Sequence, residues 1–356
     1  MKKDQTDLRK KLIRWYRRHY RQLPWRKTRD PYKIWIAEVM LQQTTVAAVI
    51  PYYLRWMESF PDLRALSRAT LQKVLKAWEG LGYYQRAKNL HRSSRIIIKE
   101  YQGRFPSDYD QLKKLPGLGS STTAALLSFA FDLPYPVLEA NVRRVLTRVM
   151  RLKGRRNPGD DIFLNFLTPL IPQKNSSQFN QAMMELGALV CKPRNPNCLL
   201  CPITDHCQAY QAGEQEIIPP PKKRDFQKIE AVIALIQDNG KYLIQKRPSQ
   251  GLLADLWEFP GGKKKRSESF SQALHREVQE ELGARIRESR FLTKVRHAYT
   301  QFQVTLYAYE CQLEKRPHLE KTRYRWVTLK GLRRYPFPSG NAKIIRFLEE
   351  KKSLQT

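Results

Sequence analysis

The sequence contains no apolar run that approaches the roughly 20 residues of a transmembrane helix. Its first residues, MKKDQTDLRKKL, contain no apolar segment of the kind that a secretory signal peptide carries. These two absences argue against an integral membrane protein and against a secreted one.

Acidic residues are few for a chain of this length. The 356 residues include 33 Asp and Glu against 65 Lys and Arg, which gives a formal net charge of +32. Such an excess favours a polyanionic partner, either nucleic acid or an acidic membrane surface. Nucleic acid is the stronger interpretation because the chain has no apolar segment that could enter a membrane. A third interpretation is that the positive charge serves only to keep the protein soluble.

Cysteine is rare outside one short segment, since four of the five cysteines lie between Cys191 and Cys207. This clustering indicates metal ligation in a reducing compartment rather than a disulfide scaffold, so we expect an intracellular protein of the cytoplasm or nucleoid. Only Cys198 and Cys201 form a CxxC pair, whereas a structural zinc site usually has two close pairs. Four thiolates also suit a [4Fe–4S] cluster, and both metal centres remain open on the residues alone. Cys311 lies in a strand-like run and is expected to be an ordinary core residue.

The chain divides into a helical and a mixed region. Residues 1–212 are predicted to be helical, with amphipathic stretches at 32–43, 45–59, 70–79, 85–101 and 122–131. Three consecutive prolines and a charge run mark 213–227 as a linker. Residues 228–356 combine strand-like runs with one helix. The expected fold is therefore multidomain: an all-α domain with a metal-cluster loop, then an α+β domain.

A glycine-rich turn stands between two helical patterns at about 108–130. Leu115, Gly117 and Gly119 form LPGLG, and Ser120 and Ser121 open the following helix. Glycines allow backbone N–H groups to point outward, and a helix N-terminus favours an anion. The motif is typical of a helix-hairpin-helix that binds the DNA backbone, although an ordinary helical corner is the alternative.

Six segments carry a resemblance to the endonuclease III-like superfamily of DNA glycosylases, and within it to the MutY adenine glycosylase family. They are LPWR (23–26), IWIAEVMLQQTTV (34–46), WEGLGYYQRAKNLH (78–91), LPGLGSST (115–122), FNQAMMELGALVCKPRNPNC (179–198) and CPITDHC (201–207). The resemblance covers nearly all of the first 210 residues. It implies a [4Fe–4S] cluster held by Cys191, Cys198, Cys201 and Cys207, with Lys192 and Arg194 of the loop facing phosphate.

Glu38 lies on an apolar face of a helix that starts at Pro31. Desolvation there would raise the pKa of its carboxyl and keep it protonated near neutrality, as an acid that protonates a leaving base requires. From the residues alone, a Glu that pairs with an arginine is the alternative. The family uses the Glu of this AEVMLQQT motif as the general acid, and the resemblance extends that role to Glu38.

Glu139 occupies the position at which the family usually has Asp, within LEANV instead of LDGNV. A carboxylate there would stabilise the oxocarbenium-like sugar. The additional methylene implies either an adapted pocket or weakened activity. Asn141 matches the pocket Asn of the family. Ser121 stands where strand-cleaving relatives have Lys, so base removal without lyase activity is expected.

Other residues are expected to contact DNA. The first Gln of the LQQT motif in the family wedges into the base stack, and here it is Gln42. Tyr83 resembles the tyrosine that inserts beside the oxidised guanine, although its position would also suit a core residue. The loop that recognises the lesion aligns with Tyr299, Thr300 and Gln301.

The C-terminal region resembles a Nudix domain. GKKKRSESFSQALHREVQEELGA, from Gly262, follows the Nudix pattern except at Ala284. Glu277, Glu280 and Glu281 would lie on one helix face and could hold Mg²⁺. Two functions remain open for this domain: recognition of the lesion strand, and hydrolysis of nucleotides.

Together these features predict a monomeric, monofunctional adenine glycosylase that acts on duplex DNA with adenine opposite 8-oxoguanine or guanine. Glu38 would protonate the flipped base, and Glu139 would stabilise the sugar. Three alternatives remain: a glycosylase for thymine or uracil opposite guanine, a catalytically impaired mismatch-binding module, and a bifunctional protein that also hydrolyses oxidised nucleotides.

Overall fold

The computed structural model describes residues 2–154, 158–220, 226–299 and 302–354. The chain forms two compact units, one of residues 1–68 with 89–223 and the other of residues 69–88 with 224–356. The boundary after residue 223 falls inside the expected linker. The assignment of 1–212 and 228–356 to separate domains stays a prediction. Among the described residues, no helix has both the length and the apolar character to cross a membrane.

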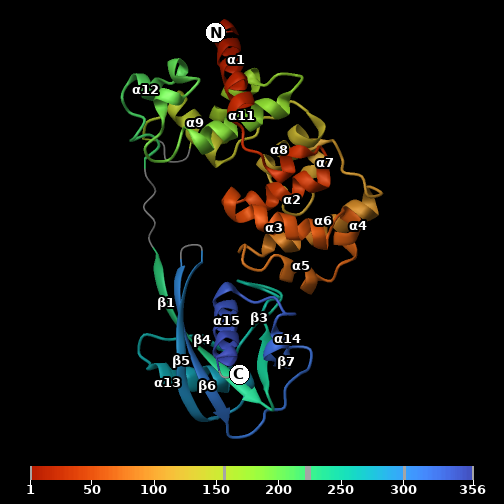
Figure 1. Ribbon diagram of the computed structural model, residues 1–356, viewed down its shortest axis with the longest axis vertical. Coiled ribbons are helices and arrows are strands. Elements are labelled where there is room, and N and C mark those ends of the chain that lie inside the picture. The colour runs from red at the N-terminus through yellow and green to blue at the C-terminus, as the bar shows by residue number, and fades with distance from the viewer. Residues whose placement is uncertain (1, 155–157, 221–225, 300–301, 355–356) are drawn as a thin grey trace. The chain divides into compact units, whose positions relative to one another are not determined.

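The first unit is helical (Figure 1). The expected helices are present, with ends that differ from the predicted ones by a few residues. Gln42 and Gln43 do not continue the second helix: it ends at Leu41, and Gln43 has a φ of 57°. The helices are α1 (Lys2–His19), α2 (Pro31–Leu41), α3 (Val46–Ser59), α4 (Leu63–Arg68), most of α6 (Gln85–Glu100), α7 (Tyr109–Lys113), α8 (Ser120–Phe131), α9 (Ala140–Val149), α10 (Asp160–Leu167), α11 (Ser176–Leu189) and α12 (Gln208–Gln211), with 3-10 turns at Pro24–Lys27, Thr168–Leu170, Cys198–Leu200 and Thr204–His206.

Helix α2 is buried on nearly all sides. Asp30 caps it by accepting the Tyr32 N–H at 2.9 Å, and Pro31 occupies the first turn. The helix packs against α3 and α8, and its buried side chains come from every face rather than from one stripe. We expected one apolar face on this helix, but the helix is buried on more than one face. Glu38 is therefore an acidic residue on a largely apolar, buried helix.

A second core lies where α9, α10 and α11 pack with α1. Helix α1 contributes Leu8 and Leu12, and α11 contributes Phe179 and Leu186, all at most 5% exposed. Ile203 of the cysteine loop is buried in the same core. The core therefore joins the helices of the candidate site to the cysteine loop.

The second unit is built on a mixed seven-stranded sheet. Strand β1 (Gln227–Asp238) runs parallel to β6 (Phe302–Leu313), which pairs antiparallel with β5 (Ile286–Tyr299). The other strands are β2 (Lys241–Lys246), β3 (Trp257–Glu258), β4 (Gly261–Lys263) and β7 (Tyr324–Thr328), and the helices are α5 (Leu71–Ala77), α13 (Phe270–Leu282), α14 (Leu329–Leu332) and α15 (Ser339–Ser353).

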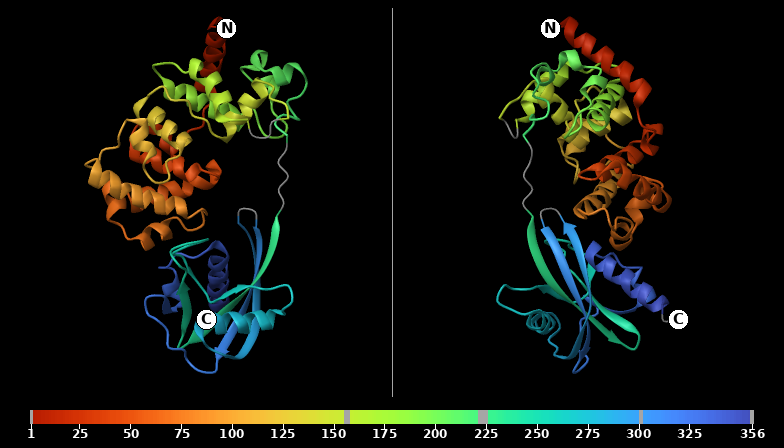
Figure 2. Two further views of the ribbon diagram at one scale, coloured as in Figure 1. Left: turned by 180° about the vertical axis from the view of Figure 1, so that it is seen from behind. Right: turned by 60° about the vertical axis from the view of Figure 1, so that its left-hand side comes forward.

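Alternate residues of β1 cover the two faces of this sheet. Val232 and Ala234 pack in the cluster that includes α13, whereas Ile233 and Leu235 pack in the cluster that includes α15. Figure 2 shows the two helices on opposite sides of the sheet. The central strand is therefore a continuous apolar run rather than an alternating one. Cys311 is buried at 4% exposure, which confirms it as a core residue.

Candidate active site

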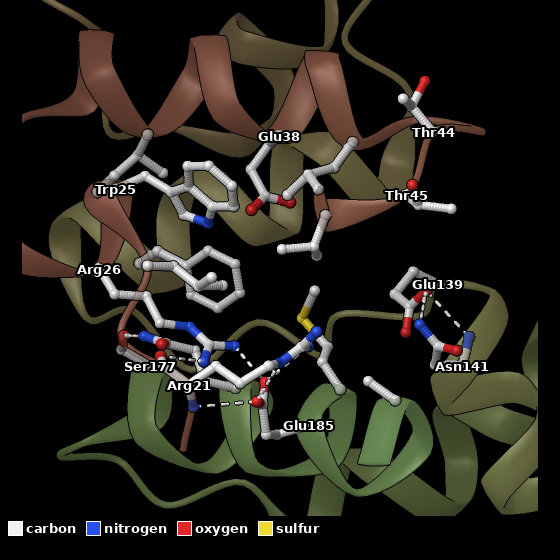
Figure 3. Close-up of a pocket in the computed structure, with 18 of the residues that line it drawn as sticks. Arg21, Trp25, Arg26, Glu38, Thr44, Thr45, Glu139, Asn141, Ser177 and Glu185 are labelled. Carbon is white, nitrogen blue, oxygen red and sulfur yellow. Dashed lines mark hydrogen bonds and ion pairs between the residues drawn. The ribbon is translucent and has the colours of Figure 1, made fainter. Parts of the chain in front are cut away.

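A cavity of about 720 Å³ opens between α2, α9 and α11, and Figure 3 shows the side chains that line it. Glu38 of α2 lines one wall, and Glu139 and Asn141 line another. The structure thus brings together the three residues that the resemblance assigned to catalysis, although Glu38 is far from the other two in the chain.

The Glu38 carboxyl is the most strongly perturbed acid of this cavity. Burial, helped by the negative charge of Glu139, raises its pKa to about 7, and Arg26 opposes the shift. This confirms the expected desolvation. A carboxyl with a pKa near neutrality can donate a proton to a leaving base under physiological conditions.

Glu139 is the N-cap of α9. Its Oε2 accepts the Asn141 N–H at 2.9 Å and the Asn141 Nδ2–H at 3.3 Å, and its Oε1 accepts the Val142 N–H at 3.1 Å. Burial raises the pKa of this carboxyl, and the donated hydrogen bonds oppose the rise. The longer side chain of Glu thus fits the cap of α9 with both oxygens bonded.

Asn141 is fixed by a close approach of α9 and α11. Its Oδ1 accepts from Arg144 Nη2 at 2.7 Å, and the same nitrogen donates to the Gly187 carbonyl at 2.7 Å. Arg144 Nε donates to the Cys191 carbonyl at 2.8 Å. The side chain of Arg144 therefore links the cavity wall that holds Asn141 to the first cysteine of the loop.

Sequence reasoning assigned no role to a buried ion-pair cluster at the other end of the cavity. The Glu185 carboxylate, with no exposed surface, pairs with Arg21 at 2.5 Å and Arg26 at 2.6 Å. Burial alone would raise the pKa of Glu185, but the hydrogen bonds from both arginines lower it below the ordinary value. Arg26 belongs to the LPWR segment and Glu185 to FNQAMMELGALVC, so both stood inside resembling segments without a chemical signal of their own.

The four clustered cysteines surround a small cavity of about 20 Å³. Their thiols are free, and each cysteine is partly buried. Four such thiolates could hold either one zinc ion or an iron–sulfur cluster. Lys192 and Arg194 of the loop are exposed, as expected.

The glycine-rich turn connects α7 to α8. Leu115 is buried at 3% exposure, whereas Gly117, Gly119 and Ser120 are exposed. Gly117 has a φ of 86°, and a Cβ there would lie 2.8 Å from the Asn89 Cβ, so a larger residue would not fit. Ser121 is partly buried in the first turn of α8. The accessible backbone of this turn can bind an anion.

The residues expected to insert into DNA lie in different surroundings. Gln42 follows α2, and its Nε2 donates to the Thr122 hydroxyl at 3.0 Å, so its side chain packs on α8. Tyr83 has a φ of 49° in a loop of the second unit, and the Arg86 guanidinium lies 5.6 Å from its ring centre. Tyr299 ends β5, and Thr300 and Gln301 lie outside the described residues.

The Nudix carboxylates are held by two kinds of contact. Arg276 pairs with Glu277 at 2.8 Å and with Glu280 at 3.1 Å, whereas Glu281 accepts the Gly261 N–H at 2.8 Å. Burial raises the pKa of Glu281 to about 7. A Cβ on Gly262 would lie 2.4 Å from the Glu277 carboxyl, so the motif packs too closely here for any residue larger than glycine.

Comparison with protein families matches three regions of the chain. Residues 36–166 match the HhH-GPD superfamily of base excision DNA repair proteins, and residues 191–207 match the iron-sulfur binding domain of endonuclease III. Residues 231–347 match the NUDIX domain. The cysteine loop is therefore an iron–sulfur binding domain.

Whole-chain comparison decides the family. An adenine DNA glycosylase of Mus musculus is 32% identical over 408 aligned residues, which cover 98% of this chain and 79% of the relative. The chain belongs to the adenine DNA glycosylase family. Another member, from Buchnera aphidicola of Schizaphis graminum, is 38% identical over 70% of this chain and 73% of its own length.

Solved structures agree with this family for the helical part. A thermostable thymine-DNA glycosylase has a TM-score of 0.55 and 27% identity, and the match covers 59% of this chain and 98% of that one. A trapped endonuclease III–DNA covalent intermediate has a TM-score of 0.53 and 25% identity over 60% of this chain and 98% of that one. The helical part of the chain, which contains the cavity, therefore resembles these two solved structures in fold.

Proposed function

We propose that this member of the adenine DNA glycosylase family removes adenine opposite 8-oxoguanine or guanine from duplex DNA. One observation carries the proposal: a single cavity holds a carboxyl with a pKa of about 7, Glu38, and a second carboxylate, Glu139. Two carboxyl groups in different environments are what cleavage of a glycosidic bond requires.

The two groups act in sequence. The protonated Glu38 carboxyl donates its proton to a ring nitrogen of the flipped adenine while the bond from the sugar to N9 breaks. The sugar becomes positively charged, and the Glu139 carboxylate stabilises it. Water then adds to the sugar carbon and gives its proton to a carboxylate of the pocket. Asn141 holds Glu139 through the hydrogen bond from Nδ2.

The Glu185 cluster suits the recognition of a base. A buried carboxylate with its two arginines offers an acceptor and several donors in fixed positions. The amino group and ring nitrogens of adenine require this combination. We infer that Arg26 and Glu185 help to select adenine.

The decisive experiment is single-turnover base release from duplexes that carry A opposite 8-oxoguanine, A opposite G, or T opposite G. Release of adenine from the first two duplexes and of no thymine from the third is expected. Release of thymine alone would establish the related mismatch glycosylase instead, and binding without any release would establish the mismatch-binding module.

Two substitutions test the role of Glu139. Glu139→Gln keeps the size of the side chain and removes its charge, so base release should slow by at least about a hundredfold. Glu139→Asp restores the charge on the shorter side chain and should recover part of the rate, unless the pocket is adapted to Glu. An unchanged rate in Glu139→Gln would refute the role.

An assay for cleavage of the DNA strand tests the prediction that the protein has no lyase activity. Ser121 cannot form a Schiff base with the sugar, so the product strand should stay intact until it is treated with alkali. Cleavage without alkali would show that another amine of the site reacts.

We propose that the iron–sulfur centre is a [4Fe–4S] cluster held by Cys191, Cys198, Cys201 and Cys207. The match of residues 191–207 to the iron-sulfur binding domain of endonuclease III supports this, as does the single cavity that the four cysteines surround. Four iron atoms and four sulfides per chain are expected. One zinc per chain and no sulfide would contradict the assignment.

Duplex DNA is the proposed partner of the basic chain, bound as a monomer, with the exposed Lys192, Arg194 and Gly119 at phosphates. Gln42 would wedge into the base stack, and Tyr83 would insert beside the oxidised guanine. Tyr299, Thr300 and Gln301 would contact the strand with 8-oxoguanine. Substitution of this triplet should then lower the preference for 8-oxoguanine over guanine without lowering release opposite guanine.

A second activity is supported by the packed Nudix motif. Glu277, Glu280 and Glu281 could hold Mg²⁺, which would place its charge against a pyrophosphate. Release of phosphate from oxidised nucleoside triphosphates with Mg²⁺, compared between the natural chain and Glu277→Gln, tests it. No release from either protein would leave the domain with recognition of the lesion strand alone.

A further inference from the structure

Arg148 is a cation buried beside the cysteine loop. Its side chain is 1% exposed, and within the described residues no carboxylate forms an ion pair with it. A buried charge without an opposite charge is costly, so a buried arginine normally has an anionic partner.

Arg148 donates hydrogen bonds to residues 191–193 at the start of the cysteine loop and to Ile218. Nη1 donates to the Cys191 Sγ at 3.2 Å and to the Lys192 carbonyl at 2.7 Å. Nη2 donates to the Pro193 carbonyl at 3.3 Å, and Nε donates to the Ile218 carbonyl at 2.7 Å. The guanidinium thus lies against a sulfur atom, and a cysteine that ligates iron carries negative charge.

Gln215 lines the same cavity. Its Oε1 is buried and has no hydrogen-bond partner among the described residues. Buried polar atoms are rarely left unsatisfied, and the oxygen and nitrogen of an amide exchange places by a simple flip. A flipped amide would present an N–H donor in place of the unsatisfied oxygen.

We propose that Arg148 and Gln215 are positioning residues that donate hydrogen bonds to sulfur atoms of the iron–sulfur centre. The inference rests on the iron–sulfur binding domain, and neither residue belongs to the matched segment 191–207. Hydrogen bonds to the sulfurs set the reduction potential of such a centre. Because a donor stabilises the more negative, reduced form, both residues hold the potential above the value that four cysteines alone would give.

The test is the midpoint potential of the purified full-length holoprotein, measured by protein-film voltammetry. Gln215→Leu removes the amide and keeps a similar volume. Its ratio of oxidised to reduced centre at a fixed applied potential should rise about fivefold to tenfold, where tenfold corresponds to about 59 mV for one electron. Gln215→Glu should move the potential further in the same direction, since a carboxylate repels the reduced form.

Arg148→Lys keeps the positive charge but cannot reach Cys191 Sγ and the Ile218 carbonyl together, so it should also lower the potential. Iron and sulfide per chain, measured for every variant, separate a shifted potential from a lost centre. If Arg148→Lys fails to retain iron, the potentials of the two Gln215 variants test the proposal.

Two controls are matched to these variants. Arg151→Lys changes an arginine near Arg148 that pairs with Glu214 at 2.7 Å, and Gln211→Leu changes a glutamine that donates to the Asp205 carbonyl at 2.7 Å. Neither residue lines the cavity, so their potentials should equal that of the natural protein. The proposal is overturned if the Gln215 variants keep full iron and the potential of the controls. Adenine release, measured separately, shows whether the proposed function fails on its own.

Discussion

At the residue scale, the two carboxyl groups of the cavity differ in burial and in the hydrogen bonds that they accept. Among the described residues, no backbone N–H group donates to the Glu38 carboxyl, and burial is the largest cause of its raised pKa. Glu139 caps a helix and accepts three N–H bonds, which favour its charged form. In the proposed mechanism, the same residue type therefore serves as the acid in one wall and as the anion in the other.

The pH dependence of adenine release follows from the pKa of Glu38. An acid must be protonated to act, so the single-turnover rate should fall about tenfold per unit above pH 7. On the acid side, the rate should fall again where Glu139 takes up a proton and loses the charge that stabilises the sugar. Glu38→Gln should lower the rate by about a hundredfold or more and remove the fall above pH 7. A flat profile through neutrality in the natural protein would contradict the assignment.

The charge of Glu139 raises the pKa of Glu38, so the two sites are coupled. Glu139→Gln should therefore move the fall in rate to lower pH as well as slow the reaction. The midpoint of the pH profile measures this shift separately from the rate. A midpoint that stays in place would show that the two carboxyls do not interact.

At the element scale, the site depends on how closely α9 and α11 approach. A Cβ on Gly187 of α11 would lie 2.6 Å from the Asn141 Cβ and 3.0 Å from the Asn141 carbonyl oxygen. The backbones of α9 and α11 therefore approach closely at the point where Asn141 and Arg144 form their hydrogen bonds. The sequence placed α9 and α11 only within a helical region of residues 1–212, and it did not predict this crossing, which no local pattern encodes.

Gly187→Ala should lower the free energy of unfolding by about 1–3 kcal/mol, because the added methyl forces the helices apart. Displacement of Asn141 should also slow adenine release. Urea unfolding and the single-turnover assay measure the two effects.

Gly159→Ala is the matched control, since a Cβ there meets nothing within 4 Å and its φ is negative. Its change in stability should stay within about 0.5 kcal/mol. Equal effects of the two substitutions would show that the crossing of α9 and α11 is not tightly packed.

At the scale of the whole molecule, the chain carries a formal charge of +32 and forms two compact units. Composition placed a linker near the boundary of the units. It did not indicate that residues 69–88 join the C-terminal unit, where Phe337 donates its N–H to Glu79 at 2.8 Å and accepts from the Tyr84 hydroxyl at 3.1 Å. Such contacts join segments far apart in the chain.

The excess of positive charge predicts strongly salt-dependent DNA binding. The logarithm of the binding constant should fall linearly with the logarithm of salt concentration, and loss of one phosphate contact should reduce the slope by about 0.9. Lys192→Ala and Arg194→Ala should each show this reduction in fluorescence anisotropy titrations.

Arg316→Ala serves as the control for these titrations, because Arg316 is exposed and pairs with Asp238 at 2.8 Å. Its slope should equal that of the natural protein. A slope unchanged by Lys192→Ala or Arg194→Ala would show that the substituted residue does not contact phosphate.

The sequence by itself determined the motifs whose chemistry is local: the cysteine spacing, the glycine-rich turn, the Nudix pattern and the acids at 38 and 139. Each depends on residues a few positions apart, so no long-range contact is needed to recognise it. Only the tertiary structure decided that Glu38, Glu139 and Glu185 share one cavity, and that Arg148 and Gln215 line the wall around the cysteines. Burial and Coulomb interactions act through space, and the partners that set them come from helices and loops distant in the chain.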